Sequence, residues 1–260
     1  MNGTLINDTF SGRELLIYLP PSYHTGRKRY PALYVHDRGD LFNPGFSDSL
    51  EMIEHFCRRG EMPELVMIGV ASEDRENEYT PFPQPHLKKT DHTYGGNGAH
   101  YAEFLARQLK PFIDRNYLTD GSRENTGIIG KSFGGLISMY TAYLEPQTFG
   151  KIGSLSGSFW FKGMIEYMRG HTFLNPDLRI YMDVGSTEGT DRDNLQKEMI
   201  PRTKEAFRIL SESGVSGEHL KFVIDEGGAH RFERFAKRFP EAVKWLFADS
   251  RPFLSQQSTE

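Results

Sequence analysis

The residues in this sequence best suited to carry out chemistry surround Ser132, in the run 130–135, which reads GKSFGG. An apolar segment enters this run, and a segment with apolar residues at helical spacing leaves it. A serine flanked by glycines between a strand and a helix is typical of a nucleophile elbow, a sharp turn whose strained backbone presents the serine hydroxyl. Gly130 and Gly134 would leave room for neighbouring backbone in such a turn. The pattern predicts that Ser132 is a nucleophile.

A serine hydroxyl is a poor nucleophile at neutral pH unless a base accepts its proton, so a histidine should follow in the chain. His230 comes after the loop 225–229, which leaves the end of an apolar strand. His219 opens that strand, where we expect a sheet edge, and His171 falls in a loop-like segment where we expect a surface position. A histidine before a helix can also be a cap or a surface group. We nevertheless predict that His230 is the general base.

The base in turn needs a carboxylate that fixes its tautomer and stabilises the imidazolium. Glu188 lies in the loop that follows the apolar strand 180–184, and that position suits such an acid. Asp183 lies inside the strand, while Asp191 and Asp193 are placed to help start the next helix, where aspartate complements the helix dipole. We predict Glu188 as the acid and keep these three aspartates as structural alternatives.

The tetrahedral intermediate of an acyl transfer also needs hydrogen-bond donors for its oxyanion, and each donor lowers the barrier by about 3–4 kcal/mol. In an elbow enzyme, one donor is the amide after the nucleophile, here that of Phe133. The second comes from the loop after an early strand. We predict the amide of Arg38, with Gly39 permitting close approach of the backbone.

The elements that must position these groups alternate along the chain. Strand-like runs, several of them continuously apolar, cover residues 14–19, 32–35, 65–70, 126–129, 152–155, 180–184 and 221–224. Helical patterns cover about 47–59, 101–113, 195–211 and 232–247, as well as the segment after Ser132. Such alternation predicts an α/β fold with a mostly parallel sheet, helices on both faces and an antiparallel N-terminal start.

Two long segments interrupt the alternation, at 72–97 and 158–175. We expect long loops or lids there, and because ligands bind beyond the carboxyl ends of parallel strands, these segments are candidates for pocket walls. Tyr79, Phe159 and Trp160 are the candidate substrate-binding residues. The alternative, that the aromatic residues around Trp160 pack on the core, is equally compatible with the sequence.

The length of 260 residues suits a single α/β domain, which we place at residues 1–254, followed by a disordered tail at 255–260. A net charge of −4 without basic blocks gives no attraction for nucleic acid. The start of the chain lacks a signal-peptide pattern, and no apolar run approaches a membrane span, so we expect a cytoplasmic protein without a membrane partner. Homo-oligomers remain possible. Cys57, the single cysteine, is expected to be structural.

Three segments together resemble the signatures of the esterase D and enterochelin esterase-like α/β-hydrolases, namely 130–135 (GKSFGG), 183–189 (DVGSTEG) and 226–230 (EGGAH). Further similar stretches are 18–21 (YLPP), 33–37 (LYVHD), 78–81 (EYTP) and 109–114 (LKPFID). The resemblance implies a serine esterase with no metal or organic cofactor, in which Ser132, Glu188 and His230 are nucleophile, acid and base.

The resemblance leaves the substrate open. Members of this group act on siderophore trilactones, S-formylglutathione and feruloyl or simple acyl esters. The chain also departs from the pattern in two places. Arg38 stands where relatives often carry glycine, and Arg231 and Phe232 follow His230 where many relatives have Glu and Trp.

Three other functions are alternatives to an esterase. A nucleotide-binding P-loop would use Gly130, Lys131 and Ser132, but Asn125 replaces its first glycine, and Ile128 and Ile129 fit a strand better than a phosphate-binding loop. A metal hydrolase would need paired ligands, and His86, His92 and His100 lack such spacing. A catalytically inactive binding module would share the fold, but a complete triad argues against it.

Overall fold

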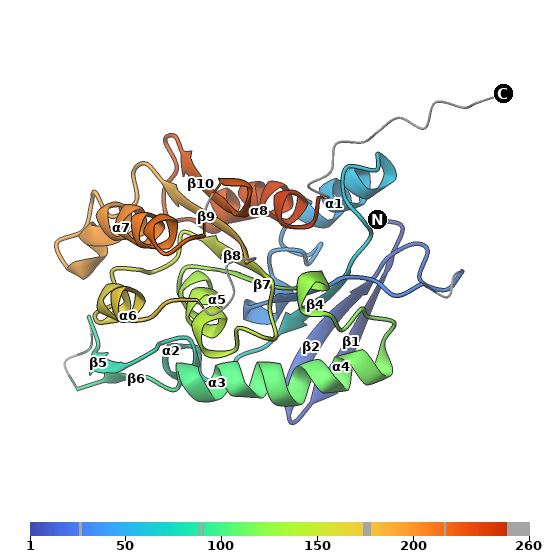
Figure 1. Ribbon diagram of the computed structural model, residues 1–260, viewed down its shortest axis with the longest axis horizontal. Coiled ribbons are helices and arrows are strands. Elements are labelled where there is room, and N and C mark those ends of the chain that lie inside the picture. Colours follow the sequence, from blue (N-terminus) through green and yellow to red (C-terminus); the bar gives the residue numbers. More distant parts are fainter. Residues whose placement is uncertain (26–27, 88, 90, 174–177, 216, 249–260) are drawn as a thin grey trace.

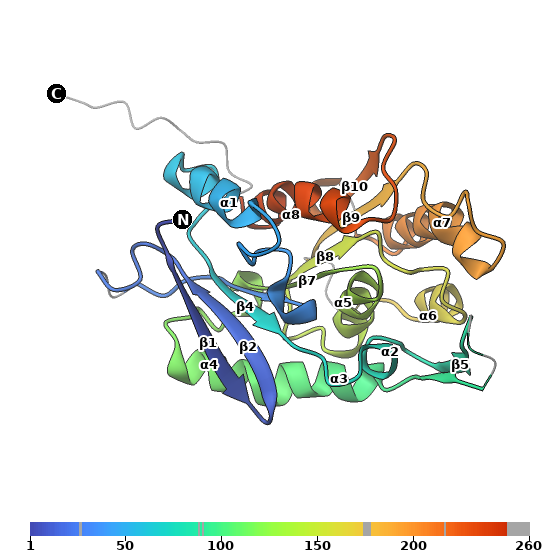
Figure 2. The same ribbon diagram turned by 180° about the vertical axis from the view of Figure 1, so that it is seen from behind.

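The computed structural model describes residues 1–25, 28–87, 89, 91–173, 178–215 and 217–248. Its centre is an eight-stranded sheet with the strand order β1-β2-β4-β3-β7-β8-β9-β10 (Figures 1 and 2). The strands are β1 (Thr4–Phe10), β2 (Arg13–Leu19), β3 (Ala32–Val35), β4 (Val66–Val70), β7 (Thr126–Lys131), β8 (Lys151–Leu155), β9 (Arg179–Gly185) and β10 (Leu220–Asp225). β1 and β2 pair antiparallel, β2 is also antiparallel to β4, and all further pairs are parallel. The predicted mostly parallel sheet with an antiparallel start is confirmed.

Helices cover both faces of this sheet, as predicted (Figures 1 and 2). Their bounds are α1 (Ser49–Arg58), α2 (Arg75–Glu78), α3 (Gly98–Phe104), α4 (Lys110–Asn116), α5 (Phe133–Leu144), α6 (Met164–Gly170), α7 (Met199–Glu212) and α8 (Phe232–Phe247), with a π-helical turn at Leu105–Leu109 between α3 and α4. α1 and α8 pack together on one face, and α3 to α7 pack on the other. Within the described residues, none of these helices has the length and apolar character to cross a membrane.

The central strands are buried on both faces because alternate side chains enter two separate apolar cores. In β3, Leu33 and Val35 pack in the core beneath α1 and α8, whereas Tyr34 packs in the core beneath α3 to α7. Met67 and Ile68 of β4 divide in the same way. Full burial of one such aliphatic side chain contributes about 1.5–3 kcal/mol. Continuously apolar runs therefore mark the strands that need cover on both faces.

The edge strand β1 is absent from the predicted strands. All its side chains are exposed or half-buried and include Asn7 and Asp8, so no apolar run marks it. It forms a hairpin with β2 through Ser11 and Gly12, whose φ angles are 50° and 79°. Positive φ at both turn residues matches the twist of a two-residue hairpin. Pairing with β2, rather than burial, therefore defines this strand.

The two long segments contain more regular structure than expected. The segment 72–97 holds α2 and a small antiparallel pair of strands, β5 (Pro83–Pro85) and β6 (Thr93–Gly95). The segment 158–175 holds α6 in its described part. The long loops or lids expected there therefore contain short helices and strands. The predicted tail at 255–260 lies outside the described residues.

Candidate active site

Ser132 occupies the turn between β7 and α5. Its φ and ψ angles are 55° and −121°, a strained conformation for a non-glycine residue. The neighbouring glycines are required by close contact, because a Cβ added to Gly130 would lie 2.6 Å from the carbonyl carbon of Gly134. The amide of Ser132 donates to the carbonyl of Leu155 on β8, at 2.9 Å, which holds the turn against the sheet. The local geometry is that of the nucleophile elbow expected from the sequence.

His230 and Glu188 lie next to Ser132 although they follow different strands. Nε2 of His230 is 3.0 Å from Oγ of Ser132, and Nδ1 of His230 is 2.7 Å from Oε2 of Glu188. The three residues come after β7, β9 and β10, whose carboxyl ends meet at one edge of the parallel sheet. The His230 side chain is 31% exposed and that of Glu188 is fully buried. The arrangement leaves the imidazole accessible and shields the carboxylate.

The buried Glu188 carboxylate is supported as an anion. Its Oε1 accepts a hydrogen bond from Oγ of Ser156 at 2.5 Å and another from the amide of Gly185 at 2.9 Å. Burial alone would raise the pKa of Glu188, but the hydrogen bond and charge of His230, with the bonds from Ser156 and Gly185, outweigh burial and lower it. An ionised carboxylate can hold the Nδ1 proton of His230 and stabilise an imidazolium.

The alternative acids and bases lie elsewhere. His219 precedes β10 and so lies at the edge of the sheet opposite Ser132, and His171 is exposed after α6. Asp183 is buried in β9 and accepts from the amide of Ser156 instead of contacting His230. Asp191 and Asp193 are exposed. They do not cap the following 3-10 helix, because Asn194 is its N-cap.

The loop after β3 approaches the elbow in an unusual backbone conformation. Asp37 and Arg38 have φ angles of 56° and 57°, in the left-handed region that glycine prefers. The amide of Asp37 donates to the hydroxyl of Tyr79 at 3.0 Å. In the described part of the chain, the amides of Arg38 and Phe133 have no such acceptor. Among the described residues, neither amide is therefore committed to another acceptor.

Lys131 anchors this loop to the strand that carries the nucleophile. Its Nζ lies 2.8 Å from Oδ2 of Asp37 and 2.6 Å from Oδ2 of Asp40, and Nε of Arg75 lies 2.7 Å from Oδ1 of Asp37. The ammonium group is thus engaged by two carboxylates, and the residues before it form β7 instead of a phosphate-binding loop. Both observations contradict the P-loop interpretation.

The ion pairs of Asp37 should make stability depend on pH. Burial alone would raise the pKa of Asp37, but the charges and hydrogen bonds of Arg75 and Lys131 lower it to about 2. A carboxyl whose pKa is lowered by folding stabilises the fold above about pH 4, the range of an unfolded aspartate, and this contribution is lost as the pH falls toward 2. We expect Asp37→Asn to lower the free energy of unfolding by about 2 kcal/mol at pH 7.

Urea unfolding of the wild type and of Asp37→Asn at several pH values measures this effect. The difference in the free energy of unfolding should narrow as the pH falls from 4 toward 2, because the wild-type carboxyl is then protonated too. A difference that stays constant over this range would mean that the ionised form of Asp37 is not what Arg75 and Lys131 stabilise.

The three candidate substrate-binding residues lie beneath the site. Tyr79, Phe159 and Trp160 are 0%, 1% and 5% exposed, too little for an accessible pocket wall. Tyr79 instead supports the loop at Asp37, and the ring of Trp160 packs 5.7 Å from that of Phe133. The structure therefore favours the core-packing alternative for Phe159 and Trp160, and Tyr79 supports the loop after β3 instead of lining a pocket.

Of the three histidines named for a metal site, His100 is exposed on α3, and the other two contact one carboxylate. Nε2 of His86 and Nε2 of His92 lie 3.3 and 3.2 Å from the two carboxylate oxygens of Glu76. Among the residues that the structure describes, no three His, Cys, Asp or Glu side chains are grouped so that they could hold a metal ion.

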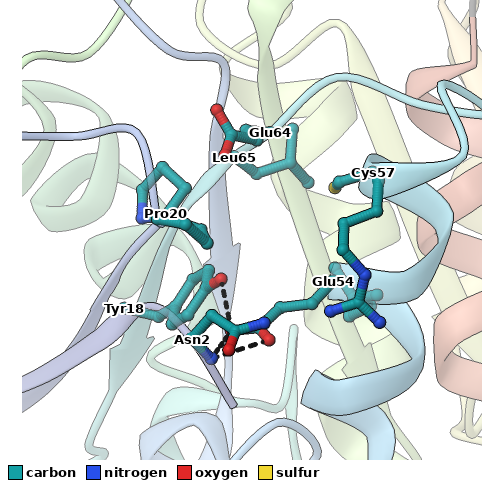
Figure 3. Close-up of a pocket in the computed structure, with 10 residues that line it drawn as sticks. Asn2, Tyr18, Pro20, Glu54, Cys57, Glu64 and Leu65 are labelled. Atoms are coloured by element: carbon teal, nitrogen blue, oxygen red, sulfur yellow. Dashed lines mark hydrogen bonds between the residues drawn. The ribbon is translucent and has the colours of Figure 1, made fainter. Parts of the chain in front are cut away.

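A separate cavity of about 310 Å³ lies between β2 and α1 (Figure 3). Its lining includes Tyr18, Glu54 and Cys57 and none of the candidate site residues. Glu54 already accepts the amides of Asn2 and Gly3 and the Tyr18 hydroxyl. Burial raises the pKa of the Cys57 thiol to about 12, in agreement with a structural cysteine.

Sequence reasoning missed two residues that contact the acid, Ser156 and Arg238. Ser156 follows β8 and has a positive φ of 47°, for which the sequence carries no signal. For Arg238 the sequence does carry a signal. It stands between Phe235 and Phe239 on the apolar face of the predicted helix 232–247, where an arginine needs a buried partner.

Known proteins include relatives of this chain. The family model described as "Putative esterase" matches residues 8–246. An uncharacterized protein of Bacillus subtilis (strain 168), YbbA, is 35% identical over 254 residues, which are 98% of this chain and all of that protein. The ferri-bacillibactin esterase BesA of the same organism is 24% identical over 218 residues, covering 74% of this chain and 72% of BesA. A solved ferulic acid esterase superposes with a TM-score of 0.72 at 16% identity over 95% of this chain and 99% of its own. This likeness confirms the predicted α/β-hydrolase fold.

Proposed function

Because this chain belongs to the Esterase family and is a hydrolase of carboxylic esters, we propose that it is a serine esterase that works through Ser132, His230 and Glu188. The observation that carries the proposal is the unbroken chain of contacts from Oγ of Ser132 to Nε2 of His230, at 3.0 Å, and from Nδ1 of His230 to Oε2 of Glu188, at 2.7 Å. Both distances allow proton transfer and orientation without further movement.

In the proposed reaction, Oγ of Ser132 attacks the ester carbonyl while Nε2 of His230 accepts its proton. The negative oxygen of the tetrahedral intermediate accepts hydrogen bonds from the amides of Phe133 and Arg38. The imidazolium gives its proton to the departing alcohol, which leaves an acyl group on Ser132. Water then gives a proton to His230 and attacks the acyl carbon. Collapse of the second intermediate releases the acid and restores the Ser132 hydroxyl.

For the substrate, we propose a siderophore trilactone, a feruloyl ester or a short acyl ester or thioester. The likeness to a ferri-bacillibactin esterase supports the first class, and the likeness to a ferulic acid esterase supports the second. Steady-state kcat/KM for p-nitrophenyl esters of increasing chain length, methyl ferulate, S-formylglutathione and a catecholate trilactone would rank these classes. We further propose a cytoplasmic enzyme that needs no metal or organic cofactor.

The pH dependence of kcat/KM should report on His230. The imidazole can accept the Ser132 proton only when it is neutral, so we expect kcat/KM measured from pH 5 to pH 8 to be lowest at the acidic end. Because the pKa of Glu188 is lowered below its ordinary value, its carboxylate is ionised throughout this range and does not cause the rise. Hydrolysis of a p-nitrophenyl ester, followed at a wavelength insensitive to p-nitrophenol ionisation, provides the profile. A flat profile would argue against His230 as the base.

A further inference from the structure

Arg238 of α8 lies behind the proposed acid, on the side away from His230. Its side chain is only 8% exposed. Nη2 donates to Oγ of Ser156 at 2.7 Å, and Nη1 donates to Oδ2 of Asp225 at 2.6 Å. Nε forms an ion pair with Oδ2 of Asp183 at 3.0 Å. One guanidinium group therefore contacts residues of β9, of β10 and of the turn after β8.

Ser156 joins this guanidinium to Glu188. Its hydroxyl accepts from Arg238 and donates to Oε1 of Glu188 at 2.5 Å. Its amide donates to Oδ1 of Asp183 at 2.9 Å, and its φ of 47° turns the hydroxyl and amide toward the two carboxylates. The Ser156 hydroxyl thus holds Oε1 of Glu188, and Oε2 of the same carboxylate faces His230.

Arg238 balances the charge of two buried carboxylates. The side chains of Asp183 and Glu188 are both fully buried, and Arg238 is 3.0 and 3.8 Å from their carboxylates. Burial raises the pKa of Asp183 to about 7, although Arg238 and the Ser156 amide act against this. Two buried carboxylates without a cation would favour protonation of one of them. The raised pKa is that of Asp183 and the pKa of Glu188 is lowered, so Asp183 takes that proton and Glu188 stays ionised.

Arg238 also links the loops that carry the acid and the base. Asp225 ends β10 and begins the loop to His230, whereas Glu188 follows β9. Figure 1 shows α8 lying beside β8 and β9, and it is this helix that brings the guanidinium to both loops. The position of His230 relative to Glu188 therefore depends on a group in neither loop.

We propose that Arg238 and Ser156 are positioning residues, which fix the Glu188 carboxylate so that one of its oxygens faces His230. This inference rests on the serine esterase function proposed above. According to this inference, the residues needed for activity extend beyond the triad to α8. Arg238 and Ser156 act through Glu188 and do not contact Ser132. The step that they affect is therefore the proton transfer by His230.

The sharpest test is Ser156→Ala. This substitution removes the hydroxyl that joins Arg238 to Glu188 and changes no charged side chain. A hydrogen bond to a buried charged group is among the stronger ones, so we expect kcat for p-nitrophenyl butyrate to fall about 10- to 100-fold. KM should change by less than about twofold, because the change affects the transition state and not substrate binding. Ser154→Ala is the matched control, since Ser154 is equally buried on β8 but donates to the carbonyl of Gly135.

Arg238→Ala provides an independent readout. Its activity should fall and should be partly restored by millimolar guanidinium chloride, in a saturable manner that a purely structural role would not produce. Arg234→Met is its control, because Arg234 binds the same Asp225 at 2.8 Å without contacting Ser156 or Glu188. If Arg238→Ala does not fold, Ser156→Ala still decides the question.

The outcomes separate this inference from the proposed function. A kcat for Ser156→Ala within twofold of wild type, or equal to that of Ser154→Ala, overturns the positioning role if Ser132→Ala is inactive. Full activity of Ser132→Ala would instead overturn the serine esterase mechanism itself. A selective loss of kcat in Ser156→Ala, with the melting temperature unchanged, supports the inference.

Discussion

Replacing Ser132 with alanine is expected to lower kcat for p-nitrophenyl butyrate by about 10⁶-fold, the loss typical of removing a triad nucleophile. Without Oγ no acyl-enzyme can form, and the remaining oxyanion donors accelerate only direct attack by water. The fold should be retained, because the substitution keeps the backbone hydrogen bond that the Ser132 amide donates to the carbonyl of Leu155. The comparison requires kcat and the melting temperature of both proteins.

Ser138→Ala is the control for this experiment. Ser138 lies on α5 near the elbow, and its buried hydroxyl donates to the carbonyl of Gly134 at 2.8 Å, away from His230. It should retain most of the wild-type activity. If Ser132→Ala retains esterase activity while Lys131→Ala abolishes ATP hydrolysis, the protein is a nucleotide-binding one after all. A wild type that binds esters without turnover would indicate an inactive module.

The elbow could be predicted because its signal is local. The run 130–135 carries the glycines that the turn needs, and the burial of β7 and α5 follows from apolar spacing on either side. The placement of His230 and Glu188 needed one further rule, that the carboxyl ends of parallel strands share an edge. Both residues follow apolar strands closely, so the rule was enough to bring them to Ser132.

The groups behind the triad could not be predicted in the same way. Ser156 and Arg238 are 82 residues apart, and their contact depends on how α8 packs on β8. The sequence also gave no means of separating burial from pocket lining at Trp160, because an aromatic residue near the carboxyl end of a strand serves either purpose. What remained undetermined was therefore the packing between elements.

The choice between Glu188 and Asp183 shows the same limit. Asp183 lies in β9 and Glu188 in the loop that directly follows it. Their positions in the sequence do not tell which of the two carboxylates contacts His230. The structure separates them by direction, because Asp183 points toward Arg238 and Glu188 contacts both Arg238 and His230. A substitution that preserves shape can test whether this difference has a chemical consequence.

Glu188→Gln should therefore lower kcat by about 10⁴-fold while KM stays nearly unchanged. The amide has the shape of the carboxylate but no charge, so it cannot stabilise the imidazolium. If its NH₂ group faces Nδ1 of His230, it donates where the carboxylate accepted, and Nε2 must then carry the proton. Such a tautomer cannot accept the proton of Ser132.

The exposed Asp191 supplies the control for this last experiment, since Asp191→Asn makes the same carboxylate-to-amide change in a side chain that is 76% exposed. It should leave kcat within about twofold of wild type. The kcat of Asp183→Asn should lie between those of Glu188→Gln and Asp191→Asn, because Asp183 contacts Arg238 but not His230. If Glu188→Gln is no more impaired than Asp183→Asn, the carboxylate that stabilises the imidazolium must be reassigned, because only a group in contact with His230 can select its tautomer.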